Sequence, residues 1–261
     1  MTEQDPSLSN PLEAVKLVYR LQHDKDARHR KVESTPLSPE MFLLRSWQAE
    51  RLARAYADVR ARPSYEKATD FFLTDLYGAK DFSQRDHDID RVYRLARRFF
   101  PPQMIKFLTL SVELNQLSAK LDTELVGALV NDLGMTDTLT PEMYTAAYRV
   151  CDNYDIRLHQ IDLVVQVGKR IDRAMRLPLI GTALKLAQAP AHTAGWHEMY
   201  DFLVRGFDAF KKMKNRHAFF QLIQTRETKI LKDIFAGIKN PFVDAPIVQL
   251  SNTKDAGNQT T

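Results

Sequence analysis

The sequence predicts an all-α protein, a single multi-helix bundle of about eight helices, on three observations. With 261 residues, 44% of them hydrophobic, the chain can bury a sizeable core. It holds only nine glycines, and the Asn-Gly and Asp-Gly pairs that mark hairpin turns do not occur. Its longer segments are rich in Leu, Ala, Arg, Lys, Gln and Glu, which favour helices. Helices are therefore expected throughout.

Helix-start signals and apolar spacing place the individual elements. Ser38 and Thr140 each precede Pro-Glu, a pattern typical of a helix N-cap followed by a helix-opening proline. The doublet Pro101-Pro102 ends one helix and begins another. The expected helices cover residues 11–30, 39–62, 64–77, 84–100, 102–132, 141–152 and 155–177, followed by a helical group from 180 to 238.

We expect one helical domain over residues 11–239, between a disordered N-terminus at 1–10 and a disordered tail at 240–261. Both ends are rich in small polar residues and have little apolar surface to bury. No stretch approaches the roughly eighteen apolar residues of a membrane span, and the first residues lack a secretory pattern. The single cysteine, Cys151, suits a reducing compartment. A cytoplasmic location is therefore expected.

Two acids stand where the helical pattern expects apolar residues. Glu227 is in register with Phe220, Ile223, Ile230, Ile234 and Ile238, and Asp75 follows Phe71 and Phe72 by one helical turn. A carboxylate on a core face is costly unless a cation or several donors meet it. Each acid is therefore expected to have a partner, with these candidates: Arg85, Arg91, Arg205, Arg226 and the Tyr77 hydroxyl. A structural salt bridge or an edge that reaches solvent also explains the pattern, and it is favoured over a binding or catalytic role.

The segment at residues 71–86 crowds aromatic and charged residues into one helix-to-helix junction. Gly78 would end one helix and Ser83 would cap the next. Asp75, Tyr77, Arg85 and Asp86 are expected to form a hydrogen-bonded polar cluster there. The candidate ligand- or partner-binding residues are Asp75, Tyr77, Arg85, Asp86, Arg205 and Glu227.

This segment also carries a resemblance to a known family. The pattern Phe-Phe-Leu-x-Asp-Leu-Tyr-Gly at 71–78, with Asp81-Phe82 and Arg85-Asp86, resembles the signature of a proteobacterial family of uncharacterised helical proteins. The stretch from Phe202 to Met213, followed by Arg226-Glu227, is similar to the C-terminal pattern of that family. The resemblance covers roughly residues 40–238. It implies a helical fold and an intracellular bacterial setting, and it implies no activity.

Two other groups of residues support alternative functions. Lys211, Lys212, Lys214 and Arg216 form a basic segment that could contact nucleic acid or an anionic surface, although a solvated helix end has the same composition. Asp155 and His159 are four residues apart, as are His197 and Asp201, so each pair could hold a metal ion from one helix face. Both pairs also fit solvated polar faces, and the sequence has no His-Glu-x-x-His box.

These observations give three hypotheses about function. The first is a non-enzymatic cytoplasmic binding or regulatory protein whose polar junction engages a protein partner or a small ligand. The second is a nucleic-acid or anionic-surface binder that uses the basic segment. The third is a helical-bundle metal enzyme that uses the two His/Asp pairs. Because no phosphate-binding glycine loop or nucleophile elbow occurs, we expect no cofactor and identify no catalytic residues, and a binding protein is favoured over an enzyme.

Overall fold

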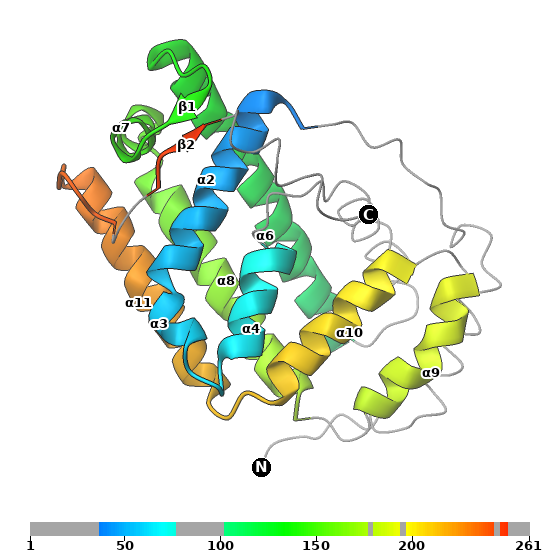
Figure 1. The fold of residues 1–261 in the computed structure, drawn as a ribbon. Helices are drawn as coiled ribbons and strands as arrows, with labels where there is room; N and C mark the ends of the chain where they lie inside the picture. Colours follow the sequence, from blue (N-terminus) through cyan, green and yellow to red (C-terminus); the bar gives the residue numbers. More distant parts are fainter. Residues whose placement is uncertain (1–36, 77–101, 177–179, 194–196, 243–245, 250–261) are drawn as a thin grey trace. The chain divides into compact units, whose positions relative to one another are not determined.

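The computed structural model of the chain is all-α, as the sequence predicts (Figure 1). It describes residues 37–76, 102–176, 180–193, 197–242 and 246–249. The described helices, with the π-helical segments η2 and η3, are α2 (Pro39–Ala55), α3 (Ala57–Arg60), α4 (Glu66–Phe71), η2 (Phe72–Leu76), α6 (Pro102–Gly127), η3 (Ala128–Asp132), α7 (Pro141–Cys151), α8 (Tyr154–Ala174), α9 (Ile180–Thr193), α10 (His197–Lys211) and α11 (Arg216–Phe235). The helices expected at 11–30 and 84–100 lie outside the described residues.

The predicted helix starts at Ser38 and Thr140 are confirmed. The Ser38 hydroxyl accepts a hydrogen bond from the Met41 backbone N–H at 3.2 Å, and α2 begins at the next residue, Pro39. The Thr140 hydroxyl accepts one from the Met143 N–H at 3.3 Å, and α7 begins at Pro141. Each hydroxyl satisfies one of the N–H groups that a helix start leaves without a partner.

The chain divides into two compact units, which are described separately. Among the described residues, the first unit contains 102–115, 166–176, 180–193 and 197–217. The second contains 37–76, 116–165, 218–242 and 246–249. The expectation of one domain over residues 11–239 stays a prediction.

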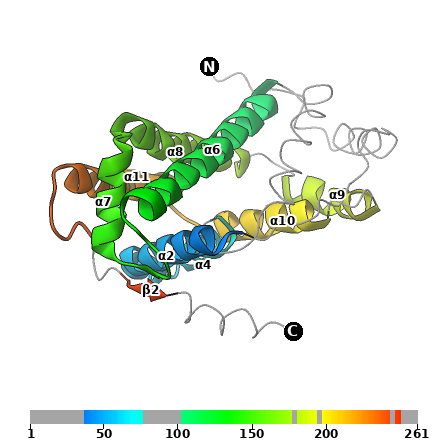
Figure 2. The ribbon, with the colours of Figure 1, turned by 90° about the horizontal axis from the view of Figure 1, so that it is seen from above.

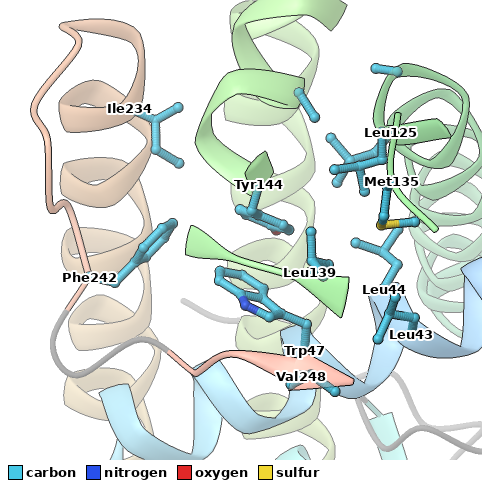
Figure 3. Close-up of a cluster of buried hydrophobic side chains, with 13 residues drawn as sticks. Leu43, Leu44, Trp47, Leu125, Met135, Leu139, Tyr144, Ile234, Phe242 and Val248 are labelled. Atoms are coloured by element: carbon cyan, nitrogen blue, oxygen red, sulfur yellow. The ribbon is translucent and has the colours of Figure 1, made fainter. Parts of the chain in front are cut away.

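The second unit has a core of stacked aromatic rings. The Trp47 and Tyr144 rings are stacked with centroids 4.0 Å apart, and Phe242 meets Trp47 edge-on at 5.4 Å. Figure 3 shows these side chains together with Leu139 and Val248. All five are buried, so the core joins α2 and α7 to segments that no helix contains.

The residues after α11 are part of this core, which corrects the disordered tail expected from residue 240. Phe242 and Val248 are buried, and the Pro246 carbonyl accepts a 2.7 Å hydrogen bond from the Trp47 indole Nε1. Strand β2 (Val248–Gln249) pairs antiparallel with β1 (Thr138–Leu139), two short strands that the sequence did not predict. We call residues 241–242 and 246–249 the C-terminal strap. Five of the nine residues 241–249 are hydrophobic, but the expectation of disorder grouped them with the mostly polar residues 251–261.

In the first unit, α9 and α10 lie side by side (Figures 1 and 2). The Tyr200 hydroxyl donates to the Leu184 carbonyl at 3.1 Å, and a Cβ on Gly181 would lie 3.1 Å from the Phe207 ring. Gly181 therefore permits the close approach of the two helices. On α10 the Tyr200 and Phe210 side chains are buried, but Leu203 is 46% exposed.

One expected core position is wrong. Ile238 was assigned to the buried stripe of the last helix, yet α11 ends at Phe235 and the Ile238 residue is 50% exposed. Gly237, with φ +74°, follows the helix end in the left-handed conformation that favours glycine. Among the described helices, none has the combination of length and apolar composition that a membrane crossing needs.

Candidate functional site

A charged group inside the second unit centres on Glu227 of α11. Arg51 of α2 donates from Nη1 to both Glu227 carboxylate oxygens, each at 2.9 Å, and the Tyr56 hydroxyl donates to Oε1 at 3.0 Å. The side chains of Arg51 and Glu227 are only 9% and 18% exposed. The expectation that Glu227 needs a cationic partner is confirmed, but the partner is Arg51, which was not among the candidates.

Arg226, a candidate partner of Glu227, pairs with a different acid. Its Nη1 and Nη2 each lie 2.7 Å from one oxygen of Asp58, and Nη1 also donates to the Ala55 carbonyl at 2.7 Å. The hydrogen bonds from Arg226 hold the pKa of Asp58 below its ordinary value. The Arg226 guanidinium also lies 5.4 Å from the centre of the Tyr56 ring, so it supports the residue that donates to Glu227.

A second polar group joins α7 and α8. The Tyr144 hydroxyl donates to the Tyr148 hydroxyl at 3.0 Å, and the Arg157 guanidinium lies 4.4 Å from the centre of the Tyr148 ring. Burial is the main reason that the pKa of Tyr144 is raised well above its ordinary value. Tyr144 therefore remains a neutral hydrogen-bond donor at physiological pH.

Asp122 of α6 is a further acid in the second unit. Its Oδ1 accepts a 3.1 Å hydrogen bond from Gln48, and the Arg45 Nε is 4.0 Å from its Oδ2. Burial raises the pKa of Asp122, and the Gln48 hydrogen bond and the charges of Arg157 and Arg45 offset this only in part. The proton is therefore held more tightly than on an exposed aspartate.

In the first unit, Asp172 of α8 brings two basic segments together. The Arg176 Nη2 is 2.7 Å from Asp172 Oδ2, and the Arg216 Nε is 2.6 Å from Oδ1. Arg216 also donates to the carbonyls of Phe210 and Met213, at 3.3 and 3.1 Å, and so holds the loop between α10 and α11. The last turns of α8 and this loop therefore form one surface.

We call the exposed cations of this surface the basic cluster. On α8, positions 169, 173 and 176 follow the i, i+4, i+7 spacing of one helix face. The remaining members come from the end of α10 and the loop that Arg216 holds. The basic cluster consists of Lys169, Arg173, Arg176, Lys211, Lys212 and Lys214, all of them exposed.

Only half of the basic cluster was predicted from the sequence. Lys211, Lys212, Lys214 and Arg216 were predicted as a basic segment, but the Arg216 side chain is only 16% exposed and holds the loop. The contribution of α8 was missed. Its sequence signal is four cations against one acid between residues 169 and 176.

The polar junction is only partly covered by the described residues. Asp75 lies in η2 and accepts a 3.1 Å hydrogen bond from the Thr74 hydroxyl. Tyr77, Arg85 and Asp86 lie outside the described residues, as do Gly78 and Ser83. Arg205 belongs to the first unit, whereas Asp75 and Glu227 belong to the second. The junction as a binding site stays a prediction.

The two candidate metal pairs are exposed and belong to different units. Asp155 and His159 lie at the start of α8 in the second unit, and His197 and Asp201 lie at the start of α10 in the first. The His192 Nε2 is 3.9 Å from Asp201 Oδ1. Within the part of the chain that the structure describes, no three His, Cys, Asp or Glu side chains gather as metal ligands would.

These features define an all-α protein with a buried charged group in one unit and a basic cluster in the other. A family model described as a domain of unknown function (DUF8198) matches residues 27–241. The chain belongs to this family, which agrees with the expected membership of an uncharacterised helical family. The proteobacterial origin and the signature at residues 71–86 stay predictions. No curated protein and no solved structure matches the chain.

Proposed function

We propose that this chain is a non-enzymatic binding protein that holds nucleic acid through the basic cluster of its first unit. The observation that carries the proposal is the Asp172 bridge, which joins Arg176 and Arg216 and so combines two basic segments into one surface. The proposed setting is a bacterial cytoplasm, which the single cysteine and the implied bacterial family support.

The charges of the basic cluster suit a phosphate backbone. Residues 169–176 carry four cations and one acid, and residues 205–217 carry five cations and one acid. Exposed Lys and Arg side chains neutralise phosphates and release counterions, which gives binding that depends little on base sequence and falls with salt. Arg176, with a side chain 70% exposed, keeps donors available beyond those that reach Asp172.

The same surface fits a membrane less well. Basic helices that lie on bilayers present large apolar side chains beside their cations. Here Phe210 and Met213, which stand among the lysines in the sequence, are each 2% exposed. The Lys211 Nζ lies 5.4 Å from the centre of the Phe207 ring, over an aromatic residue that is itself half-buried. The cations are therefore the part of this surface that a partner can reach.

Fluorescence anisotropy with a labelled DNA duplex, titrated at several salt concentrations, tests the proposal. A variant with Lys169→Gln, Lys212→Gln and Lys214→Gln leaves Arg176 and Arg216 on Asp172 intact. Each phosphate contact contributes about 0.9 to the slope of log K against log salt, so this variant should lower the slope by up to about 3. The matched control changes three exposed lysines of the second unit, Lys67, Lys232 and Lys239, to Gln.

The control should bind the duplex almost as the unchanged chain does. Equal losses in both variants would mean that net charge alone determines binding and would overturn the assignment to the basic cluster. Binding to vesicles with anionic lipid, without binding to DNA or RNA, would replace nucleic acid by a membrane surface.

A further inference from the structure

The basic cluster consists of two rows of cations. Lys169, Arg173 and Arg176 form the first row, which extends about 10 Å along α8 and the turn after it, at ~1.5 Å per residue. The three lysines at the end of α10 and in the loop after it form the second row. Asp172 joins the rows, because it accepts hydrogen bonds from Arg176 at 2.7 Å and from Arg216 at 2.6 Å.

Arg216 fixes the backbone that carries the second row. Besides its bond to Asp172, its Nη1 donates to the carbonyls of Phe210 and Met213, on both sides of the first two lysines. The Arg216 and Asp172 side chains are both 16% exposed, so water competes little for these bonds. A partner therefore does not have to order the loop on binding, and a partner that is itself rigid loses little conformational freedom either.

The aromatic side chains of this surface face inward. Phe210 is 2% exposed, and Phe207 is half-buried beneath a lysine ammonium that lies 5.4 Å from the centre of its ring. The stretches 166–176 and 205–217, which carry the two rows, are described throughout. Within them no Phe, Tyr or Trp ring is exposed, and the His217 imidazole is the single exposed aromatic ring.

The burial of these rings distinguishes between two kinds of nucleic acid. Proteins that bind single strands stack successive bases on exposed aromatic side chains, which supply a large share of the affinity. A duplex keeps its bases stacked inside and presents its phosphates at about one charge per 1.7 Å of axis, twice the density of one of its strands. Six exposed cations without a stacking surface therefore match a duplex better than a single strand.

We infer that the partner of the basic cluster is double-stranded nucleic acid, held by its phosphate backbone and without base stacking. The inference rests on the proposed function and adds the class of nucleic acid. DNA and RNA duplexes share this backbone chemistry, so both belong to the class. Arg216 is the positioning residue, because its bonds hold the second row beside the first.

Anisotropy titrations of the full chain with a DNA duplex, an RNA duplex of the same sequence and an oligo-dT strand of the same length test the inference. At equal ionic strength, at least one duplex should bind at least about tenfold more tightly than oligo-dT, with a steeper salt dependence. A difference between the two duplexes would identify which of them is the source of the backbone. Oligo-dT binding as tight as duplex binding would overturn the inference and leave the proposed function standing, whereas no binding to any of the three would overturn both.

Arg216→Gln tests the positioning role, because it frees the loop and removes one positive charge. The ratio of duplex affinity to oligo-dT affinity should fall at least about threefold, since a freed second row adapts to either partner. Lys212→Gln, the matched control, also removes one charge but keeps the bridge, and it should weaken both affinities while preserving their ratio. An unchanged ratio in Arg216→Gln would overturn the positioning role.

Asp172→Asn tests the same bridge if Arg216→Gln does not fold. This variant keeps the Arg216 bonds to the two carbonyls and makes the surface more positive by one charge. Charge alone therefore predicts tighter binding of both nucleic acids with an unchanged ratio. We expect the ratio of duplex affinity to oligo-dT affinity to fall instead, and an unchanged ratio would show that the two rows need no connection.

Discussion

Arg51 Nη1 lies 2.9 Å from both carboxylate oxygens of Glu227, although the two residues are 176 positions apart in the chain. One nitrogen thus joins α2 to α11 inside the second unit. The Tyr56 hydroxyl adds a third donor bond to the same carboxylate. Both side chains are largely buried, so removing one of them leaves the charge of the remaining residue buried without an opposite charge.

Glu227→Gln and Arg51→Met should each lower the free energy of unfolding by about 3 kcal/mol. The double variant should lose less than the sum of the two, because neither partner is then left alone. Urea unfolding measures all three losses. The exposed pair Arg54–Glu50 is the comparison, and breaking it should cost under about 1 kcal/mol. Strictly additive losses would show that Arg51 and Glu227 do not act as a pair.

A chain ending at Asn240 should melt at a lower temperature, because it loses the C-terminal strap. The midpoint should fall by more than about 5 °C, since the strap contributes the buried Phe242 and Val248. A chain ending at Gln249 keeps these contacts and should melt like the full chain. Thermal melts followed by circular dichroism give both midpoints. Equal midpoints for the two truncations would mean that the strap contributes no stability.

Trp47→Phe isolates one bond of the strap. It keeps an aromatic ring against Tyr144 but removes the indole N–H that donates to the Pro246 carbonyl. We expect a loss of about 1 to 3 kcal/mol, from the unpaired buried carbonyl and the smaller ring. Chemical denaturation of the two chains measures it. A variant as stable as the unchanged chain would mean that this hydrogen bond does not contribute to the stabilisation provided by the strap.

Asp122 should make the protein less stable as the pH rises. Its pKa is raised in the folded state, chiefly by burial, so its contribution is fully present below the pKa of an unfolded aspartate and is lost as the pH rises through the folded pKa. Asp122→Asn keeps the acceptor for Gln48 and removes this dependence. The variant should therefore gain stability relative to the unchanged chain as the pH increases, in unfolding curves from pH 4 upward. If the difference in unfolding free energy between the two proteins stays the same across this pH range, burial does not raise the pKa of Asp122 as argued.

Asp172 should show the opposite dependence. Burial alone would raise its pKa, but the hydrogen bonds from Arg216 and Arg176 outweigh burial and lower the pKa below its ordinary value. A lowered folded pKa contributes stability above the pKa of an unfolded aspartate, and this stability is lost as the pH falls through the folded pKa. The loss caused by Asp172→Asn should therefore shrink in acid. A loss that stays constant down to about pH 3 would contradict this assignment.

Local signals in the sequence predicted the helices well. Ser38 and Thr140 mark the starts of α2 and α7 because a hydroxyl three residues before a free N–H can bond to it in any sequence context. The need of Glu227 for a cation was also predictable, because a carboxylate stands there at a helix position where the periodicity expects an apolar side chain. These inferences use only neighbours within one helix.

The partners across the fold were not predictable in the same way. Arg51 and Arg226 are both arginines on helices, and only the packing of α2 against α11 decides which one meets Glu227. The C-terminal strap did not stand out, because the mostly polar residues 251–261 follow it and lower the apolar content of the segment. Its burial depends on contacts with Trp47, which lies 199 positions before Pro246. The basic cluster likewise required the contact between Asp172 and Arg216.

The C-terminal strap also determines when the second unit can be completed during synthesis. The ribosome makes α2 and α7 before it makes the residues that cover Trp47 and pair with Leu139. Until then the ring stack remains partly uncovered, and folding must wait for a contact between segments 199 positions apart in the sequence. Termination before the strap, or proteolytic cleavage in the exposed stretch 236–240, would leave an uncovered aromatic surface, prone to aggregation and to binding by chaperones.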